Sequence, residues 1–341
     1  MGKSKTYELK PKKTDPSYRL KETNYPAKKY KKGSPTITRL SFEIPAGRVT
    51  RYIDIAKALS ALNRKMYRQG CYYYVTSVEM YDNGVQTTNL MTVPDNWVTR
   101  SAYRRAKGLY DEMINRAHDT LPSSIVPKYH DFRVYMSDLH RTTGTLDVNL
   151  YGVNDLAQAV VPDEYQYTEF VTHDTNDGSQ PADEFYAHMI GGTVETGSGA
   201  TSNVHSVGLI SSYGKGRATV HQASPNLQNI DVTDPLMNLF DYSAEEVQND
   251  IIFNLDENGD LPPYDIDEYV GANVDHMEHQ VRLSTAGTVG RVIHGQGFCA
   301  PLGLICVDPV PVGQGETDTA FRIVLNIASG PYNGVYAERM A

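Results

Sequence analysis

Two histidines have a spacing at which side chains can share a metal ion. His276 and His279, in the stretch DHMEHQ, are three residues apart and would lie on one face of a helix. The H-E-x-x-H order of a zinc protease is absent, however, and we expect a strand at this point. A structural or surface role is therefore predicted for both histidines, with no metal bound.

Two glycine-containing stretches look like phosphate-binding loops but lack required positions. SSYGKGRAT has neither the earlier glycine nor the Ser or Thr directly after Lys215 that such a loop needs. In GQGFCAPLG, Pro301 stands where a dinucleotide-binding fold would begin its helix. Both stretches are predicted to be turns. Because no G-x-S-x-G sequence exposes a serine nucleophile either, we predict that the chain is not an enzyme and binds no cofactor.

An acidic stretch and three cysteines are the other candidates for metal chemistry. The carboxylates could hold a calcium ion at an interface, but their spacing fails the EF-hand loop, so a solvated acidic loop is the simpler interpretation. Cys71, Cys299 and Cys306 are odd in number and scattered, which argues against a disulfide framework and indicates a reducing compartment. The six carboxylates belong to Asp256, Glu257, Asp260, Asp265, Asp267 and Glu268.

The strongest chemical signal is the segregation of charge along the chain. Residues 1–35 contain ten Lys and one Arg against three acidic residues, a net charge of +8, although the whole chain has a formal net charge of -9. From residue 108 onwards there are ten basic and 33 acidic residues. This asymmetry predicts that the basic end binds a polyanion. Its basic residues are Lys3, Lys5, Lys10, Lys12, Lys13, Arg19, Lys21, Lys28, Lys29, Lys31 and Lys32.

Aromatic residues among these cations indicate which polyanion to expect. Tyr7, Tyr18, Tyr25 and Tyr30 recur through the segment, and aromatic rings between cations suit base stacking beside phosphate neutralisation. A single-stranded nucleic acid is therefore the predicted ligand. The alternative is that the segment is only a solubilising tail.

A second group of basic residues lies in a stretch with helical periodicity. Val98, Ala102, Ala106, Leu109 and Met113 are expected to form its apolar stripe. The basic residues fall on another face, which is either a solvated surface or a second phosphate-facing patch. They are Arg100, Arg104, Arg105 and Lys107.

The elements that carry these residues are predicted to be mostly strands. Residues 1–35 have too little apolar surface to fold alone and are expected to be an extended or disordered arm. Apolar periodicity predicts helices near 51–68 and 95–118, the first ending at Gly70 and the second capped by Asp95 or Asn96. Runs of β-branched and aromatic residues predict strands within 36–47, 71–81, 128–138, 167–174, 184–192, 203–214, 279–295, 302–308 and 319–330.

Many short strands separated by turn residues predict one β-sandwich or barrel over residues 36–341. Residues 231–275 are rich in Pro and acidic residues and are expected to form a long surface loop with a short helix at 243–252. The chain has no apolar run near the roughly 20 residues of a membrane helix, and its N-terminus lacks the apolar core of a signal peptide. A soluble protein without membrane insertion is predicted.

Three segments resemble capsid proteins of small circular Rep-encoding single-stranded DNA viruses, especially unclassified marine and metagenomic ones. They are IDIAKALSALNRKMYRQGCYYYV, VPDNWVTRSAYRRAKGLYDEMINRA and KYHDFRVYM, within residues 41–136. The resemblance implies a single jelly-roll subunit, an icosahedral homo-oligomeric shell, and packaging of circular single-stranded DNA behind the basic arm. It also implies that the second basic patch lines the shell's interior. The implied locations are the virion and, during assembly, the host cell and its nucleus, with a host-cell surface receptor as a further partner.

Two other classes of protein fit parts of the sequence. A non-viral β-domain that binds single-stranded nucleic acid would share the basic arm but would form small, discrete oligomers. A carbohydrate-active β-sandwich, either a hydrolase or a lectin, would use the carboxylates between Asp256 and Asp267. Electron microscopy of the purified protein distinguishes these alternatives from a capsid subunit.

Overall fold

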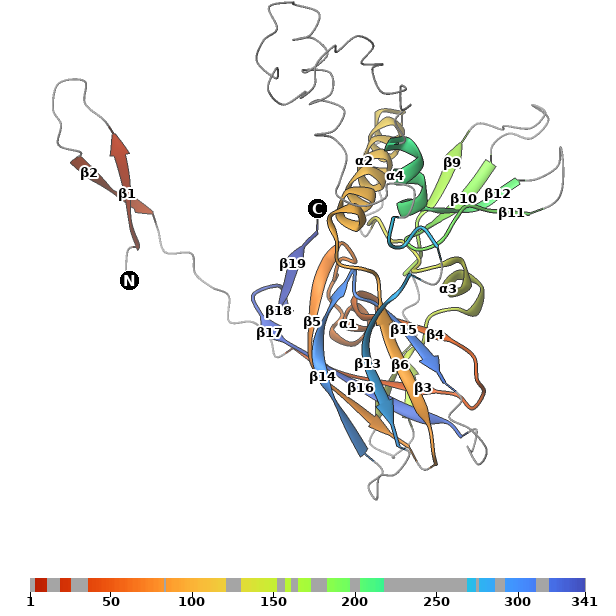
Figure 1. Cartoon of the computed structure of the whole chain (residues 1–341). Coiled ribbons are helices and arrows are strands. Elements are labelled where there is room, and N and C mark those ends of the chain that lie inside the picture. Colours follow the sequence, from red (N-terminus) through yellow and green to blue (C-terminus); the bar gives the residue numbers. More distant parts are fainter. Residues whose placement is uncertain are drawn as a thin grey trace, which may run out of the picture. The chain divides into compact units, whose positions relative to one another are not determined.

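The computed structural model divides the chain into two compact units, Met1–Thr36 and Ile37–Ala341 (Figure 1). It describes residues 4–10, 19–25, 36–82, 84–120, 130–151, 157–160, 165–172, 183–196, 203–217, 269–273, 276–285, 292–310 and 319–340. The described part is mostly β and contains four helices, which confirms the predicted class. None of these helices is long and apolar enough to cross a membrane.

The first unit contains two paired strands. β1 (Ser4–Lys10) and β2 (Arg19–Tyr25) run antiparallel, with Ser4 opposite Tyr25 and Lys10 opposite Arg19. The prediction of an extended segment agrees with these strands, but the composition of the segment did not indicate that they pair. A hairpin alone is marginally stable in water, because two strands have no third element against which to bury a face.

The second unit is built on eight strands. β3 and β5 belong to one sheet and β4 and β6 to another, so successive strands alternate between the two sheets. The alternation repeats at the other end of the chain, where β13 and β15 belong to the second sheet and β14 and β16 to the first. The strands are β3 (Arg39–Ile44), β4 (Arg51–Asp54), β5 (Cys71–Tyr81), β6 (Thr87–Thr92), β13 (Glu278–Ser284), β14 (Val292–Pro301), β15 (Leu304–Pro309) and β16 (Phe321–Ile327).

These eight strands pair as nested antiparallel partners. The outermost pair is β3 with β16, followed inward along the chain by β4 with β15, β5 with β14 and β6 with β13. Further pairs between β5 and β16 and between β6 and β15 complete the sheets β14-β5-β16-β3 and β13-β6-β15-β4. The first half of the eight-strand framework is therefore hydrogen-bonded strand by strand to the second half.

The two sheets enclose the first hydrophobic core. Alternate residues of β3, namely Leu40, Phe42 and Ile44, are fully buried there, as the two-residue period of a strand requires. β15 is buried on both faces, because Ile305 belongs to this core and Leu304 to a second one. This accounts for the uninterrupted apolar run in β15, which a half-exposed strand would not need.

The second core lies between the β13-β6-β15-β4 sheet and an insertion between β6 and β13. Val98, Ala102 and Ala106 of a long helix contribute to it, together with Met189 and Ile210. The insertion contains α2 (Trp97–Thr120), α3 (Asp138–Thr143), α4 (Leu209–Arg217), β7 (Val148–Tyr151), β8 (Ala157–Val160), β9 (Glu169–Thr172), β10 (Asp183–His188), β11 (Val194–Thr196) and β12 (Asn203–Gly208).

The strands of the insertion form one sheet and extend another. β9 to β12 make a sheet in the order β11-β12-β10-β9, and β7 and β8 continue the first sheet beyond β3. At the end of the chain, β19 (Ala337–Arg339) pairs with β5, and β17 (Ser329–Gly330) pairs with β18 (Gly334–Val335).

The helix predicted near 51–68 is shorter than expected. α1 spans Ile55–Asn63, and the preceding residues Arg51–Asp54 form β4 instead. Asp54 ends the strand and caps the helix, because its Oδ1 accepts a hydrogen bond from the Lys57 amide at 3.0 Å. The helix ends where Arg64 adopts a left-handed conformation with φ 51°, so Gly70 is not its cap.

Two further predictions are wrong, and one holds only in part. SSYGKGRAT is not a turn, because residues up to Arg217 continue α4. In GQGFCAPLG, Gly295 and Gly297 lie inside β14, and the turn is confined to Leu302 and Gly303 at the end of the stretch. The expected strand 128–138 has no regular ladder over its described residues, since Tyr135 makes only an isolated bridge to His188.

Several predictions fall outside the described residues. They are the acidic stretch from Asp256 to Glu268, the short helix at 243–252 and most of the long loop at 231–275.

Candidate nucleic-acid interface

Helix α2 carries the predicted second basic patch, and its start is well defined. Asn96 caps it, because the Asn96 Oδ1 accepts a hydrogen bond from the Thr99 amide at 2.8 Å. One face is buried by the predicted Val98, Ala102 and Ala106. Leu109, which was expected on this face, is instead 56% exposed.

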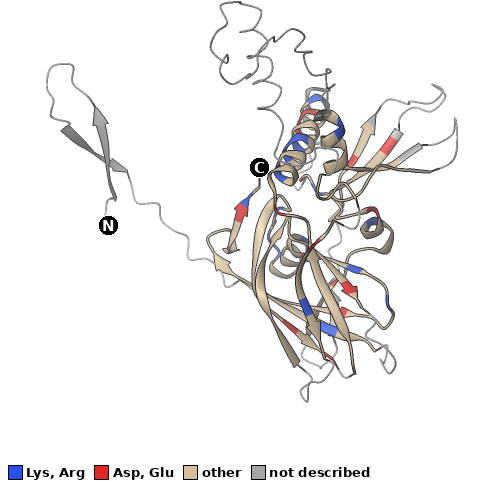
Figure 2. Ribbon diagram, in the orientation of Figure 1, with Lys and Arg blue, Asp and Glu red and all other residues tan. Residues whose placement is uncertain are grey.

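Basic residues recur along the ribbon of α2 (Figure 2). Arg100, Arg104 and Arg105 are exposed, and Lys107 is half-buried. Arg100 forms an ion pair with Asp95 at 3.0 Å, and its guanidinium lies 5.3 Å from the centre of the Tyr72 ring. Arg104 donates from Nε to the Met340 carbonyl at 3.1 Å. Each contact leaves part of the guanidinium accessible, so both residues still present positive charge at the surface.

Lys107 and Arg105 leave the helix in different directions. The Lys107 ammonium lies 2.6 Å from the Asp111 carboxylate, one turn further along α2. Arg105 packs against α4, where a Cβ added to Gly216 would lie 2.2 Å from the Arg105 Nη1. Arg100 thus approaches β5 and Arg104 approaches Met340, whereas Arg105 lies on the α4 side.

A small cavity brings Lys107 together with two arginines that the sequence analysis did not select. Arg68 follows α1, and Arg339 is the last residue of β19. The cavity has a volume of about 120 Å³. Helical periodicity could not reveal this group, because its members come from three separate elements. The lining residues are Arg68, Gly70, Cys71, Tyr103, Lys107, Asp131 and Arg339.

Asp131 is the one acidic residue among the described residues that line this cavity. Its side chain is 6% exposed, and its Oδ1 lies 3.7 Å from Nη1 of Arg68. Burial raises the pKa of the carboxyl group above its ordinary value, while the charges of Arg68 and Arg133 oppose the rise. The Oδ2 atom is buried and has no hydrogen-bond partner among the described residues.

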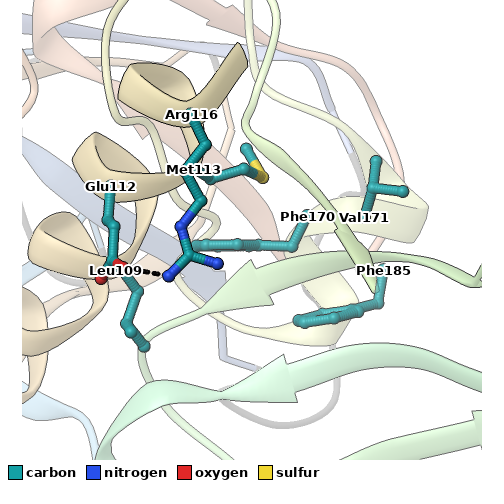
Figure 3. Close-up of a pocket in the computed structure, with 7 residues that line it drawn as sticks. All are labelled: Leu109, Glu112, Met113, Arg116, Phe170, Val171 and Phe185. Carbon is teal, nitrogen blue, oxygen red and sulfur yellow. Dashed lines mark hydrogen bonds and ion pairs between the residues drawn. The ribbon is translucent and has the colours of Figure 1, made fainter. Parts of the chain in front are cut away.

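A larger groove on the same helix has a different character (Figure 3). Its volume is about 420 Å³, and it lies between α2 and strands β9 and β10. Figure 3 shows the ion pair of Arg116 with Glu112 beside it. Apolar side chains make up the rest of the lining, so the groove is unsuited to binding phosphate. These are Leu109, Met113, Phe170, Val171 and Phe185.

The arm residues are only partly described. Lys5 and Lys10 lie in β1, and Arg19 and Lys21 lie in β2. The remaining basic residues of the arm fall outside the described part of the chain. They are Lys3, Lys12, Lys13, Lys28, Lys29, Lys31 and Lys32.

The candidates for metal and thiol chemistry are not brought together in the described residues. His279 lies in β13, as a strand context predicts, with Nε2 3.3 Å from Asn89 Oδ1. No group of three or more His, Cys, Asp or Glu side chains there is placed to hold a metal ion. Cys71, Cys299 and Cys306 are free thiols, and burial raises the pKa of Cys299 to about 11.

Comparisons with known proteins identify no relative. No protein-family model, curated protein or solved structure matches the chain. The family resemblance of the segments within residues 41–136 therefore stays a prediction.

Proposed function

We propose that residues 36–341 form a single jelly-roll subunit of a viral capsid, and that residues 1–35 are the arm through which the shell binds single-stranded DNA. The nested pairing of β3 with β16, β4 with β15, β5 with β14 and β6 with β13 supports the jelly roll. In that fold, eight strands are wound as one long antiparallel ribbon into two facing sheets. This pairing order is the observation that carries the proposal.

A jelly roll alone does not select a capsid protein, because lectins and cupins use the same architecture. The charge distribution favours a capsid. A net charge of +8 over residues 1–35 stands against a strongly acidic remainder. A shell that packages DNA requires cations on its inside, and acidic residues elsewhere keep the subunits soluble and repel other polyanions.

The arm is proposed to bind DNA with little regard to sequence. Lys and Arg on an extended segment can follow a phosphate backbone, but they do not present fixed donors to base edges. Arg100, Arg104, Arg105 and Lys107 are proposed to add a weaker patch on the inner wall of the shell. In this account the chain is a structural protein of the virion without catalytic activity, its partners being further copies of itself, the genome and a host-cell receptor.

Electron microscopy of the purified protein tests the proposal. We expect closed, uniform particles, because edge strands and loops of neighbouring subunits must cover one another in a shell. Small discrete oligomers that bind single-stranded DNA would favour a non-viral binding protein. A protein that stays monomeric across buffers, salt concentrations and added DNA would contradict the proposal.

A further inference from the structure

The exposed side of helix α2 concentrates positive charge. Residues 97–110 contain four basic residues and no acidic one, and Figure 2 shows basic residues recurring along this helix. Asp95, just before this stretch, pairs with Arg100 at 3.0 Å. Asp111, just after it, pairs with Lys107 at 2.6 Å. Two carboxylates therefore oppose four cations, which leaves a net positive charge on this side of α2.

Trp97, the single tryptophan of the chain, lies on the same side. Ser101, Arg104 and Gly108 follow it at intervals of four, three and four residues, which places all of them on one line along the helix. Trp97 is 39% exposed. Arg104 is also exposed, and a Cβ added at Gly108 would have nothing within 4 Å. The line that begins at Trp97 is therefore open to solvent.

Cations flank Trp97 on both sides of this line. Successive residues of an α-helix are rotated by about 100°, so Arg100 lies about 60° to one side of Trp97 and Arg105 about 80° to the other. The Arg100 side chain is 48% exposed despite its ion pair, and Arg105 is exposed as well. The buried Ala106 lies on the opposite side of the helix, against the second core. The indole is thus at the centre of a cationic surface.

Two tyrosines hold the indole in place. Tyr213 belongs to α4, which lies beside α2 (Figure 1), and Tyr269 precedes β13 in the chain. The centre of each tyrosine ring is 6.3 Å from that of Trp97, and the ring planes are nearly perpendicular, at 77° and 89°. Neither tyrosine is stacked parallel to the indole. A ring that its neighbours already hold loses little conformational freedom when a ligand stacks on it.

A single exposed apolar side chain is common and indicates nothing by itself. An aromatic ring among cations is different, because proteins bind single strands with rings that stack on bases beside a positively charged surface that follows the backbone. We propose that a base of single-stranded DNA stacks on Trp97 while the flanking arginines contact the neighbouring phosphates. This inference rests on the proposed binding of DNA, and it adds a contact to bases that the cations alone would not make. Every base has a π face, so the contact is compatible with binding that has little regard to sequence.

The fluorescence of the unaltered full-length chain tests the proposal, because the single tryptophan reports on this site alone. The probe is oligo-dT of about 40 nucleotides, which exceeds the roughly 4–16 nucleotides that one binding fold covers. At saturation, followed by the anisotropy of a label on the strand, a base stacked on the indole should reduce its emission. Binding without a change in emission would overturn the stacking on Trp97 and leave the proposed function intact. Failure to bind the strand at all would overturn both.

Inorganic polyphosphate separates stacking from the neutralisation of charge. It carries phosphates without bases, so it should compete with DNA for the cations but leave the emission of Trp97 unchanged. An equal loss of emission with polyphosphate would show that the indole responds to charge or to assembly, and the inference would fail.

Substitutions locate the contact. Trp97→Ala should weaken the binding of oligo-dT about tenfold, within the range for one base stacked on an aromatic ring, and Trp97→Phe should retain most of the affinity. Tyr336→Ala is the matched control, because Tyr336 is also 39% exposed but its hydroxyl donates to the Glu338 carboxylate at 2.7 Å. This control should bind like the unaltered chain. Unchanged affinity of Trp97→Ala, or an equal loss in Tyr336→Ala, would contradict the proposal.

Discussion

At the scale of single residues, a buried network of hydrogen bonds is centred on the Asp54 carboxylate. Its Oδ2 accepts hydrogen bonds from Gln69 Nε2 and from the Tyr165 and Tyr167 hydroxyls, each at 3.2 Å, and its Oδ1 caps α1. Burial raises the pKa of the Asp54 carboxyl group. These partners come from separate parts of the chain, so the carboxylate joins α1 to the segment before β9.

Replacing Asp54 with Ala should strongly destabilise the second unit. The change removes a helix cap and leaves three buried donors without their acceptor, which we expect to lower the free energy of unfolding by about 3–5 kcal/mol. Asp147→Ala is the matched control, because the Asp147 carboxylate pairs with Lys57 at 3.7 Å but is 36% exposed. It should cost less than about 1 kcal/mol. Urea unfolding measures both, and similar losses would contradict the role given to Asp54.

The burial of His140 predicts that the stability of the fold decreases in acid. It is buried, its Nδ1 accepts a hydrogen bond from the Met136 amide at 3.0 Å, and burial lowers its pKa to about 3. Its ordinary pKa is near 6.5, so between these two values the unfolded chain binds a proton that the folded chain does not. The free energy of unfolding should therefore fall as the pH falls through this window, by up to about 1.4 kcal/mol per pH unit.

The variant His140→Asn isolates this effect. The Asn side chain can still accept the bond from Met136 but does not titrate. Its stability deficit relative to the unaltered protein should be largest at pH 7 and should shrink towards pH 4. Chemical denaturation over this range measures the difference, and a deficit that stays constant with pH would show that His140 does not titrate as described.

At the scale of elements, the packing of α4 depends on neighbouring side chains that lie close to its backbone. α4 contains two glycines, which the sequence analysis interpreted as a turn, yet both lie against neighbours. A Cβ at Gly214 would be 2.5 Å from the Tyr269 ring, and one at Gly216 would meet Arg105. The helix can pack here because these side chains are missing. Local propensity disfavours glycine in a helix, and tertiary contact overrides that preference.

Substituting two helical glycines should therefore have opposite effects. Gly108 lies in α2 with nothing within 4 Å of an added Cβ, so Gly108→Ala should raise the free energy of unfolding by about 0.5–1 kcal/mol through helix propensity. Gly214→Ala gains the same propensity but must displace the buried Tyr269, and should lower stability by about 1–3 kcal/mol. Thermal unfolding of the two variants measures this, and stabilisation by both would contradict the packing of α4.

Prediction from sequence succeeded where the local residue pattern indicates the same element that tertiary pairing forms. β5 spans the predicted Cys71–Tyr81, because a run of aromatic and β-branched residues ends at the turn residue Asp82. It failed at Arg51–Asp54, where helical spacing of Tyr52, Ile55 and Leu59 masked a strand that exists only through pairing with β15. The cavity at Asp131 could not be predicted either, since its residues are brought together by the packing of distant elements.

At the scale of the whole molecule, the proposed binding of nucleic acid rests on the segregation of charge along the chain. The arm carries a net charge of +8. If about eight phosphates are neutralised per arm, the slope of log K against log salt for single-stranded DNA should be roughly -6, at about -0.7 per phosphate. Salt should therefore weaken binding steeply.

Two variants divide this dependence between the arm and α2. Removing residues 1–35 should leave the β unit folded and abolish most of the slope. Changing Arg100, Arg104, Arg105 and Lys107 to Gln should reduce binding less. The control for the loss of four positive charges is the same change to Gln at four basic residues outside α2. These are Arg39, Arg48, Arg51 and Arg282. Equal affinities of the intact and shortened chains, or a nearly flat slope for the intact one, would show that the arm is a solvated tail.

Protection of DNA from nuclease is the sharpest test of the proposed capsid function, because it requires both a closed shell and a genome inside it. The intact chain, assembled with circular single-stranded DNA and treated with nuclease, should retain full-length DNA in particles that sediment as one species. The chain without residues 1–35 should retain none. If the DNA mixed with the intact chain is degraded as fast as free DNA, this protein does not enclose a genome, and the account of a capsid subunit is contradicted.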